Sequence, residues 1–297
     1  MTDTSTATFS PAASETAAAP AGAGTNATTS APTSAPRLVV RYADEEAVAQ
    51  AAAARAILTI SDLLATPGKE RVDFAVTGGG DGIHVLEVMA ASPLLGSVDW
   101  SRVHFWWGDD RFVAADDDDR NAKQAREALL DGMVSAGLLP EANIHEMPAD
   151  TRSAAEREEA SDDDDQAAAD LSADAYAREL RDQLGDDPRM DIALFGVGPD
   201  GHFASLFPRH TEITISDPAR LATGVINSPK PPSLRVSLTV PIIQKSHQVW
   251  VIASSATKLD AMDKALRVVN DPLVPVSHAA GTDHTVWMVD RAAVPQL

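Results

Sequence analysis

Cysteine is absent from this chain of 297 residues. A chain without cysteine has no disulfide framework, no thiolate nucleophile and no zinc–thiolate site. The absence of cysteine is ordinary for a protein of a reducing compartment. Long apolar runs are absent too, because no stretch of about 18 apolar residues occurs, and a transmembrane helix needs roughly that length. We therefore expect a cytoplasmic protein with no membrane partner.

Basic residues are few. The chain has 24 lysines and arginines against 44 aspartates and glutamates, so its formal net charge is −20. Much of the acid lies in two runs, Asp116–Asp119 and Glu156–Asp174. No basic stripe is present to displace counterions from a phosphate backbone, so we expect no nucleic-acid partner. Acidic runs are typically solvated, and we expect an acidic mobile loop at about residues 151–168.

The N-terminal segment differs in composition from the rest of the chain. Residues 1–36 contain no lysine or arginine and consist largely of Ala, Thr, Ser, Pro and Gly. Without a basic start and an apolar core this segment does not resemble a secretory signal, and we expect a disordered tail. Residues 37–297 fit a single domain, for which we expect a monomer or a weak homo-oligomer.

Beyond the tail, helical and strand patterns alternate. Apolar residues at helical spacing predict helices, and short apolar runs bounded by Gly or Pro predict buried strands. The expected helices cover residues 44–65, 83–91, 122–130, 167–184 and 257–269, and the expected strands cover 72–77, 103–107, 192–195, 234–238, 249–253 and 286–289. This alternation indicates an α/β fold with a mostly parallel central sheet and helices on both faces. Functional residues should then collect where the strands end.

The first such strand end carries three consecutive glycines, Gly78, Gly79 and Gly80. Their backbone N–H groups, followed by a helix N-terminus, could hold a phosphate group. The same glycines could equally form a tight strand-to-helix turn that needs a positive φ. The residues alone leave both interpretations open.

The second strand end carries charge among aromatic residues. Asp109 and Arg111 follow a strand that ends in Trp106 and Trp107, and Phe112 comes next. A surface turn would explain the charges, but charged groups enclosed by aromatic side chains more often bind a ligand. We therefore expect Asp109 and Arg111 to face a ligand.

The third strand end places Asp200 and His202 in a glycine-rich turn. The run from Gly196 to Gly201 matches the dinucleotide pattern G-x-G-x-x-G, but Pro199 interrupts the turn and Pro208 prevents a long helix from following. The pattern therefore does not indicate a dinucleotide. His202 has no His or Cys partner at metal-ligand spacing, so we expect no metal and no cofactor. The chain also lacks the serine-esterase elbow and the P-loop.

These segments resemble a known family. The segment around His202, residues 107–113, residues 227–239 and residues 254–260 occur in the order found in 6-phosphogluconolactonases. The resemblance extends over nearly everything from Arg37 onward. It implies a Rossmann-like three-layer α/β/α sandwich, the substrate 6-phospho-D-glucono-1,5-lactone, and a place in the oxidative pentose phosphate pathway.

Glucosamine-6-phosphate deaminases are the main alternative, because they share the Gly-x-Asp-Gly-His core and also bind a sugar phosphate. They follow the histidine with Ile-Ala-Phe-Asn-Glu-Pro, whose glutamate assists ring opening, whereas this chain has Phe207 at the glutamate position. They also place a tyrosine where this chain has Arg111. Both differences favour the lactonase. A sugar-phosphate binding module without activity is a third possibility.

The resemblance and the chemistry of a lactone together imply a set of roles. Hydrolysis needs a base for water, which we assign to His202, and Asp200 could orient its imidazole or the water. The phosphate would be held by the N–H groups of Gly78–Gly80 and by the cations Arg111 and Lys258. Arg235 could join them or could equally form an ion pair at a strand edge. Asp109 would hold a sugar hydroxyl or position Arg111.

One departure from the family pattern concerns the first glycine turn. The family often has Gly-Gly-Ser-Thr-Pro where this chain has Gly79-Gly80-Asp81-Gly82-Ile83. A carboxylate opposes a phosphate, so we expect Asp81 to point away or to hold a hydroxyl.

Overall fold

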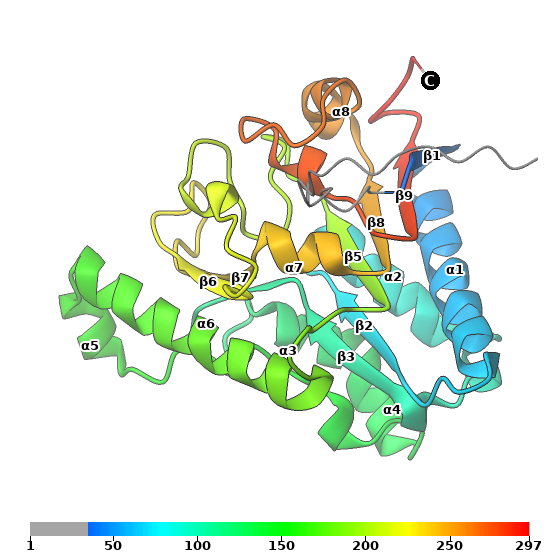
Figure 1. Cartoon of the computed structure of the whole chain (residues 1–297), viewed down its shortest axis with the longest axis horizontal. Coiled ribbons are helices and arrows are strands. Elements are labelled where there is room, and N and C mark those ends of the chain that lie inside the picture. Colours follow the sequence, from blue (N-terminus) through cyan, green and yellow to red (C-terminus); the bar gives the residue numbers. More distant parts are fainter. Residues whose placement is uncertain (1–34, 297) are drawn as a thin grey trace, which may run out of the picture. The chain divides into compact units, whose positions relative to one another are not determined.

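The computed structural model describes residues 35–296, so all but the last two residues of the expected tail at 1–36 lie outside the described part of the chain. A six-stranded sheet runs through the centre, and each neighbouring pair of its strands is parallel (Figure 1). From one edge to the other its strands are β3 (Val103–Trp107), β2 (Val72–Val76), β5 (Ile192–Gly196), β8 (Gln248–Ala253), β9 (His284–Asp290) and β1 (Arg37–Tyr42). The prediction of an α/β fold with a mostly parallel central sheet is confirmed.

The strand order reverses next to β2. The chain passes from β2 to β3 on one side and later returns to β5 on the other side. At such a reversal the connections after the two strands lead to opposite faces of the sheet, and a crevice forms at their carboxyl ends. The glycine turn at Gly78 follows β2 and the turn that carries His202 follows β5, so both predicted turns meet at this crevice.

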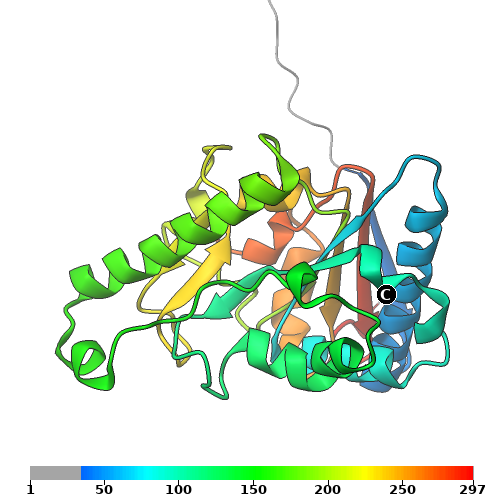
Figure 2. The same cartoon turned by 90° about the horizontal axis from the view of Figure 1, so that it is seen from below.

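Helices cover both faces of the sheet. Helices α1 (Glu45–Ala65) and α2 (Gly79–Ala91) pack against each other on one face, and α6 (Asp162–Leu184) lies on the other (Figures 1 and 2). The remaining α-helices are short: α3 (Asn121–Ala125), α4 (Asp131–Ser135), α5 (Ala154–Glu159), α7 (Val240–Lys245) and α8 (Leu259–Ala265). A π-helical turn, Arg126–Leu130, joins α3 to α4.

Asp44 is the N-cap of helix α1, and its carboxylate accepts a hydrogen bond from the N–H of Ala47 at 2.9 Å. Its buried side is rich in alanine and packs against α2 and β9. Within residues 35–296, α1 alone is long and apolar enough to cross a membrane by length and composition, a test that core helices also pass.

A second, smaller sheet continues from the end of β3. Strands β4 (Asp109–Arg111), β7 (Arg235–Leu238) and β6 (Ala222–Val225) are antiparallel neighbours in this order. Gly108 joins the two sheets, because its N–H donates to Val76 and its carbonyl accepts from Leu238. The strand expected at 234–238 is therefore present, but in the small sheet. Sequence patterning did not predict β1, β4 or β6.

The expected acidic loop at about residues 151–168 is wrong as secondary structure. The structure has α5 and the first turns of α6 there, and each helix starts with a capping box, Ser153 with Glu156 and Ser161 with Asp164. The run Asp162–Asp165 forms the first turn of α6, where the partial positive charge of a helix N-terminus stabilises carboxylates. Like charges that look unfavourable in sequence are thus compatible with a helix.

Candidate active site

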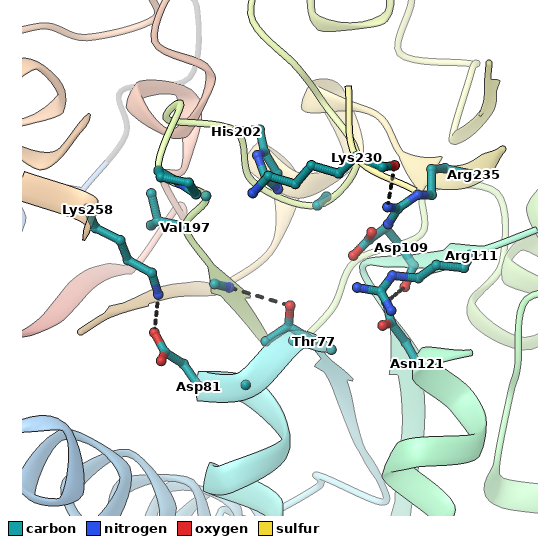
Figure 3. A pocket seen from close by; sticks show the side chains of 17 residues that line it. Thr77, Asp81, Asp109, Arg111, Asn121, Val197, His202, Lys230, Arg235 and Lys258 are labelled. Carbon is teal, nitrogen blue, oxygen red and sulfur yellow. Dashed lines mark hydrogen bonds and ion pairs between the residues drawn. The ribbon is translucent and has the colours of Figure 1, made fainter. Parts of the chain in front are cut away.

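A cavity of about 250 Å³ lies at the carboxyl ends of β2 and β5 (Figure 3). Eight of the nine predicted site residues line it: Gly78, Gly79, Gly80, Asp109, Arg111, His202, Arg235 and Lys258. The ninth, Asp200, touches the ring of His202. Residues from five separate segments of the chain therefore surround one space.

His202 is held on several sides. Its Nδ1 lies 2.5 Å from Oδ1 of Asp200, and its ring centroid lies 4.6 Å from that of Phe207, which is buried. A Cβ added to Gly198 would lie 2.0 Å from Nδ1 and Cε1 of His202. The glycine at 198 thus leaves room for the imidazole, which explains a dinucleotide-like glycine pattern without a dinucleotide.

These contacts set the proton positions on the imidazole. Burial alone would raise the pKa of Asp200, but the hydrogen bond and the charge of His202 hold it at about 2, so the carboxylate is ionised at neutral pH. An ionised carboxylate only accepts hydrogen bonds, and Nδ1 must therefore donate. In the neutral ring this leaves Nε2 without a proton, free to accept one.

Two arginines lie next to each other on neighbouring strands of the small sheet. Arg111 on β4 pairs in register with Arg235 on β7. The guanidinium of Arg235 is buried and donates to the carbonyl oxygens of Pro232 at 2.7 Å and Lys230 at 3.1 Å. Burial lowers the pKa of Arg235 to about 10. Arg111 donates to the carbonyl of Asp119 at 2.6 Å.

The two aspartates before Arg111 have different surroundings. Asp109 lines the cavity and accepts a hydrogen bond from Oγ of Ser205 at 2.7 Å. Asp110 points away from the cavity wall and accepts from the N–H groups of Arg111 and Asn121, both at 2.7 Å. Burial raises the pKa of Asp110 to about 6. Asp110 therefore ties β4 to the start of α3, whereas Asp109 is available to a ligand.

The glycine turn is a tight turn that also faces the cavity, and its phosphate-binding role stays a prediction. Gly79 has φ +76, the conformation that a tight turn requires, and all three glycines line the cavity. Gly78 has a further constraint, because a Cβ there would lie 1.8 Å from Oδ1 of Asn121.

Lys258 reaches the cavity after β8, and its ammonium forms an ion pair with Asp81 (Figure 3). Asp81 itself lines the cavity, so of the two expected alternatives the one in which it points away is wrong, and the one in which it holds a hydroxyl stays a prediction.

Three polar side chains that line the cavity were not predicted from the sequence: Thr77, Asn121 and Lys230. Lys230 lies in the connection between β6 and β7, and Figure 3 shows its side chain extending toward His202. Burial lowers the pKa of Lys230. Asn121 is buried and donates to the carbonyl of Asp109 at 2.9 Å. The one sequence signal that could have indicated Lys230 as a site residue was its position among three prolines.

Metal ligands are not grouped in the described part of the chain. Among residues 35–296 no three His, Asp or Glu side chains are arranged to hold a metal ion.

Comparisons with known proteins identify the family of the chain. A family profile described as glucosamine-6-phosphate isomerases/6-phosphogluconolactonase matches residues 43–287. A 6-phosphogluconolactonase of Streptomyces coelicolor is 39% identical over 264 residues, which cover 87% of this chain and 94% of that protein. One of Mycobacterium leprae is 36% identical over 257 residues, covering 86% and 96%. The structure of 6-phosphogluconolactonase from Trypanosoma brucei shares the fold, with a TM-score of 0.74 at 23% identity over 89% of this chain and 100% of that chain. The chain belongs to the glucosamine-6-phosphate isomerase/6-phosphogluconolactonase family.

Proposed function

We propose that the protein hydrolyses 6-phospho-D-glucono-1,5-lactone to 6-phosphogluconate, a step of the oxidative pentose phosphate pathway. The observation that carries this proposal is a histidine whose Nδ1 contacts a carboxylate, at the wall of a cavity lined by four cations. The curated relatives named as 6-phosphogluconolactonases, aligned over most of their length, support the same substrate.

The cations supply the phosphate site. Arg111 and Arg235 stand directly opposite each other in an antiparallel pair, an arrangement that repels unless an anion compensates the charge. Planar guanidinium groups suit a phosphate because they donate paired hydrogen bonds. Lys258 and the N–H groups of Gly78–Gly80 complete the cradle from the opposite wall. Phosphate binding there orients the lactone ring for attack.

His202 acts on the lactone carbonyl through water. Its Nε2 takes a proton from a water molecule as the water oxygen forms a bond to C1 of the lactone. The bond between C1 and the ring oxygen then breaks, and the proton on Nε2 passes to that oxygen, which becomes a hydroxyl group. The imidazole returns to its starting state, and Asp200 stabilises the imidazolium between the two steps.

Negative charge develops on the carbonyl oxygen during attack. Lys230 is the cation best placed to stabilise it, because its side chain extends toward His202 and its charge acts on Asp200 (Figure 3). A cation fixed in a partly buried site stabilises a transition-state charge more strongly than one in water. Asp109 would bind a sugar hydroxyl at the other wall.

Phe207 argues against deamination. Its ring is buried and packs on His202, where a deaminase of this superfamily would present a glutamate. A phenyl ring exchanges no proton, so ring opening of an amino sugar would lack its acid.

The test is hydrolysis of freshly generated lactone by the purified full chain, followed by acid release. We expect a rate well above the spontaneous one, and a loss of about 10²- to 10⁴-fold in kcat for His202→Ala. His284→Ala is the matched control, since this exposed histidine begins β9 and so lies at the amino ends of the parallel strands, whereas the cavity lies at their carboxyl ends. A rate no faster than the spontaneous one refutes the proposal, and ammonia release from glucosamine 6-phosphate would favour the deaminase.

A further inference from the structure

Asp81 occupies an unusual place for a carboxylate in a phosphate-binding cavity. It lies in the first turn of α2, beside the glycine turn, and lines the cavity with Gly79 and Gly80. The partial positive charge at the N-terminus of α2 favours a carboxylate there. The same charge would otherwise be available to a phosphate, so Asp81 competes with the ligand for this end of the helix.

The carboxylate of Asp81 is saturated by donors from the segment after β8. Oδ1 accepts from Oγ of Ser254 at 2.7 Å, and Oδ2 accepts from the N–H of Ser254 at 3.2 Å and pairs with the ammonium of Lys258. The side chains of Asp81 and Lys258 are each 14% exposed. In such a partly buried site two opposite charges interact more strongly than they would in water.

This pair divides the cavity into two ends of different charge. At one end the charge of Lys258 is compensated by Asp81. At the other end Arg111 and Arg235 line the wall with Asp109, and Lys230 extends from that side toward His202 (Figure 3). The first end is therefore close to neutral, and the second carries a net positive charge.

We propose that Asp81 is an affinity-limiting residue, which compensates the charge of Lys258 and so keeps the cavity from binding phosphate too tightly. This inference rests on the proposed function, because the benefit comes from the reaction. Hydrolysis converts the lactone into a carboxylate, so the product carries one more negative charge than the substrate. A cavity with one fewer uncompensated cation releases that product more readily.

Asp81→Asn is the direct test, because the amide keeps the shape of the side chain and an acceptor for Ser254 but loses the charge. We expect the KM for the lactone and the inhibition constant of inorganic phosphate both to fall about fivefold. The gain should shrink as salt is added, since screening weakens charge effects. The kcat should fall if product release limits turnover. Asp81→Ser, which also removes the charge and keeps a small polar side chain, serves if the first variant does not fold.

Two further variants separate charge from other roles. Asp118→Asn makes the same change of charge at an exposed pair with Lys123, and should leave both constants unchanged. Lys258→Met should weaken phosphate binding, and the double variant Asp81→Asn/Lys258→Met should return to within about twofold of wild type, because its net charge at this end is again zero. A purely structural role of Asp81 would produce no such restoration.

Two outcomes overturn the inference. If Asp81→Asn raises the KM for the lactone and leaves phosphate inhibition unchanged, Asp81 binds a substrate hydroxyl. If neither constant changes, the pair has no influence on anion binding. Calorimetric titration of inorganic phosphate into the full chain needs no activity, so it tests Asp81 even if the wild-type protein does not hydrolyse the lactone. Failure of the inference and failure of the proposed function are therefore distinguishable.

Discussion

Replacing Gly198 with alanine should inactivate the enzyme without unfolding it. The φ of Gly198 is not positive, so the backbone accepts an alanine. The added Cβ would, however, lie 2.0 Å from Nδ1 and Cε1 of His202 and 2.6 Å from Oδ1 of Asp200. The nearest groups that must move are therefore the two side chains assigned to the base and to its orientation.

The size of the effect follows from these distances. An ordinary contact begins at 3.4 Å, so the imidazole must move by about 1.4 Å from a starting separation of 2.0 Å. A displacement of about 1 Å can cost roughly 10²-fold in rate, and loss of general-base catalysis costs up to about 10⁴-fold. We expect kcat to fall between these limits, which corresponds to about 2.7–5.4 kcal/mol of activation free energy.

Lactone hydrolysis and thermal unfolding, measured side by side, test this reasoning. Gly132→Ala is the matched control, because Gly132 lies in α4 with nothing within 4 Å of an added Cβ. That variant should keep its activity and gain a little stability. If Gly198→Ala retains more than a tenth of wild-type kcat while folded, the contact between Gly198 and His202 does not constrain the base, and our account of this turn fails.

Three other predictions follow from particular contacts. Arg111→Ala should raise the KM for the lactone at least tenfold, roughly the value of one charge-assisted contact, and an unchanged KM would remove Arg111 from the phosphate site. Tyr176→Phe should lower the free energy of unfolding by about 1–3 kcal/mol in urea titrations, because the buried N–H of Trp107 loses its only side-chain acceptor. The kcat should stay unchanged, and a loss of stability under about 0.5 kcal/mol contradicts this prediction. Burial and the charge of Arg71 lower the pKa of His104 from 6.5 to about 4, so the unfolded chain takes up the proton first and stability is lost as the pH falls from 6.5 toward 4. His104→Gln should flatten that dependence in unfolding titrations at pH 4.5 and 7, and parallel slopes for the two proteins would contradict it.

Local sequence patterns predicted every strand of the central sheet except β1. These strands are short, apolar and bounded by glycine or charge, and burial on both faces produces such runs. The small sheet was not predicted as a sheet, because β4 is only three residues of charged side chains and β6 contains Gly224. That glycine lets α6 approach, since a Cβ there would lie 2.8 Å from Ala169. A local sequence pattern does not predict such close packing between segments far apart in the chain.

The acidic run shows how a sequence signal can be present and still be outweighed. Ser153 with Glu156 three residues later is a capping box, and Ser161 with Asp164 has the same spacing. The density of like charge favoured a loop instead. In the structure the partial positive charge of the helix N-terminus stabilises the acidic run, and so does Arg152, which pairs with Asp150 and Asp165.

The sequence by itself determined the class of fold and the pairing of His202 with Asp200. Asp200 and His202 are two residues apart in one glycine turn, so their contact depends on local backbone geometry. The tertiary structure alone decided the rest of the cavity. Arg111 meets Arg235 through antiparallel register, and Asp81 meets Lys258 across a separation of 177 positions. Contacts of this range are set by strand order and by packing of the whole sheet, which no local pattern of residues encodes.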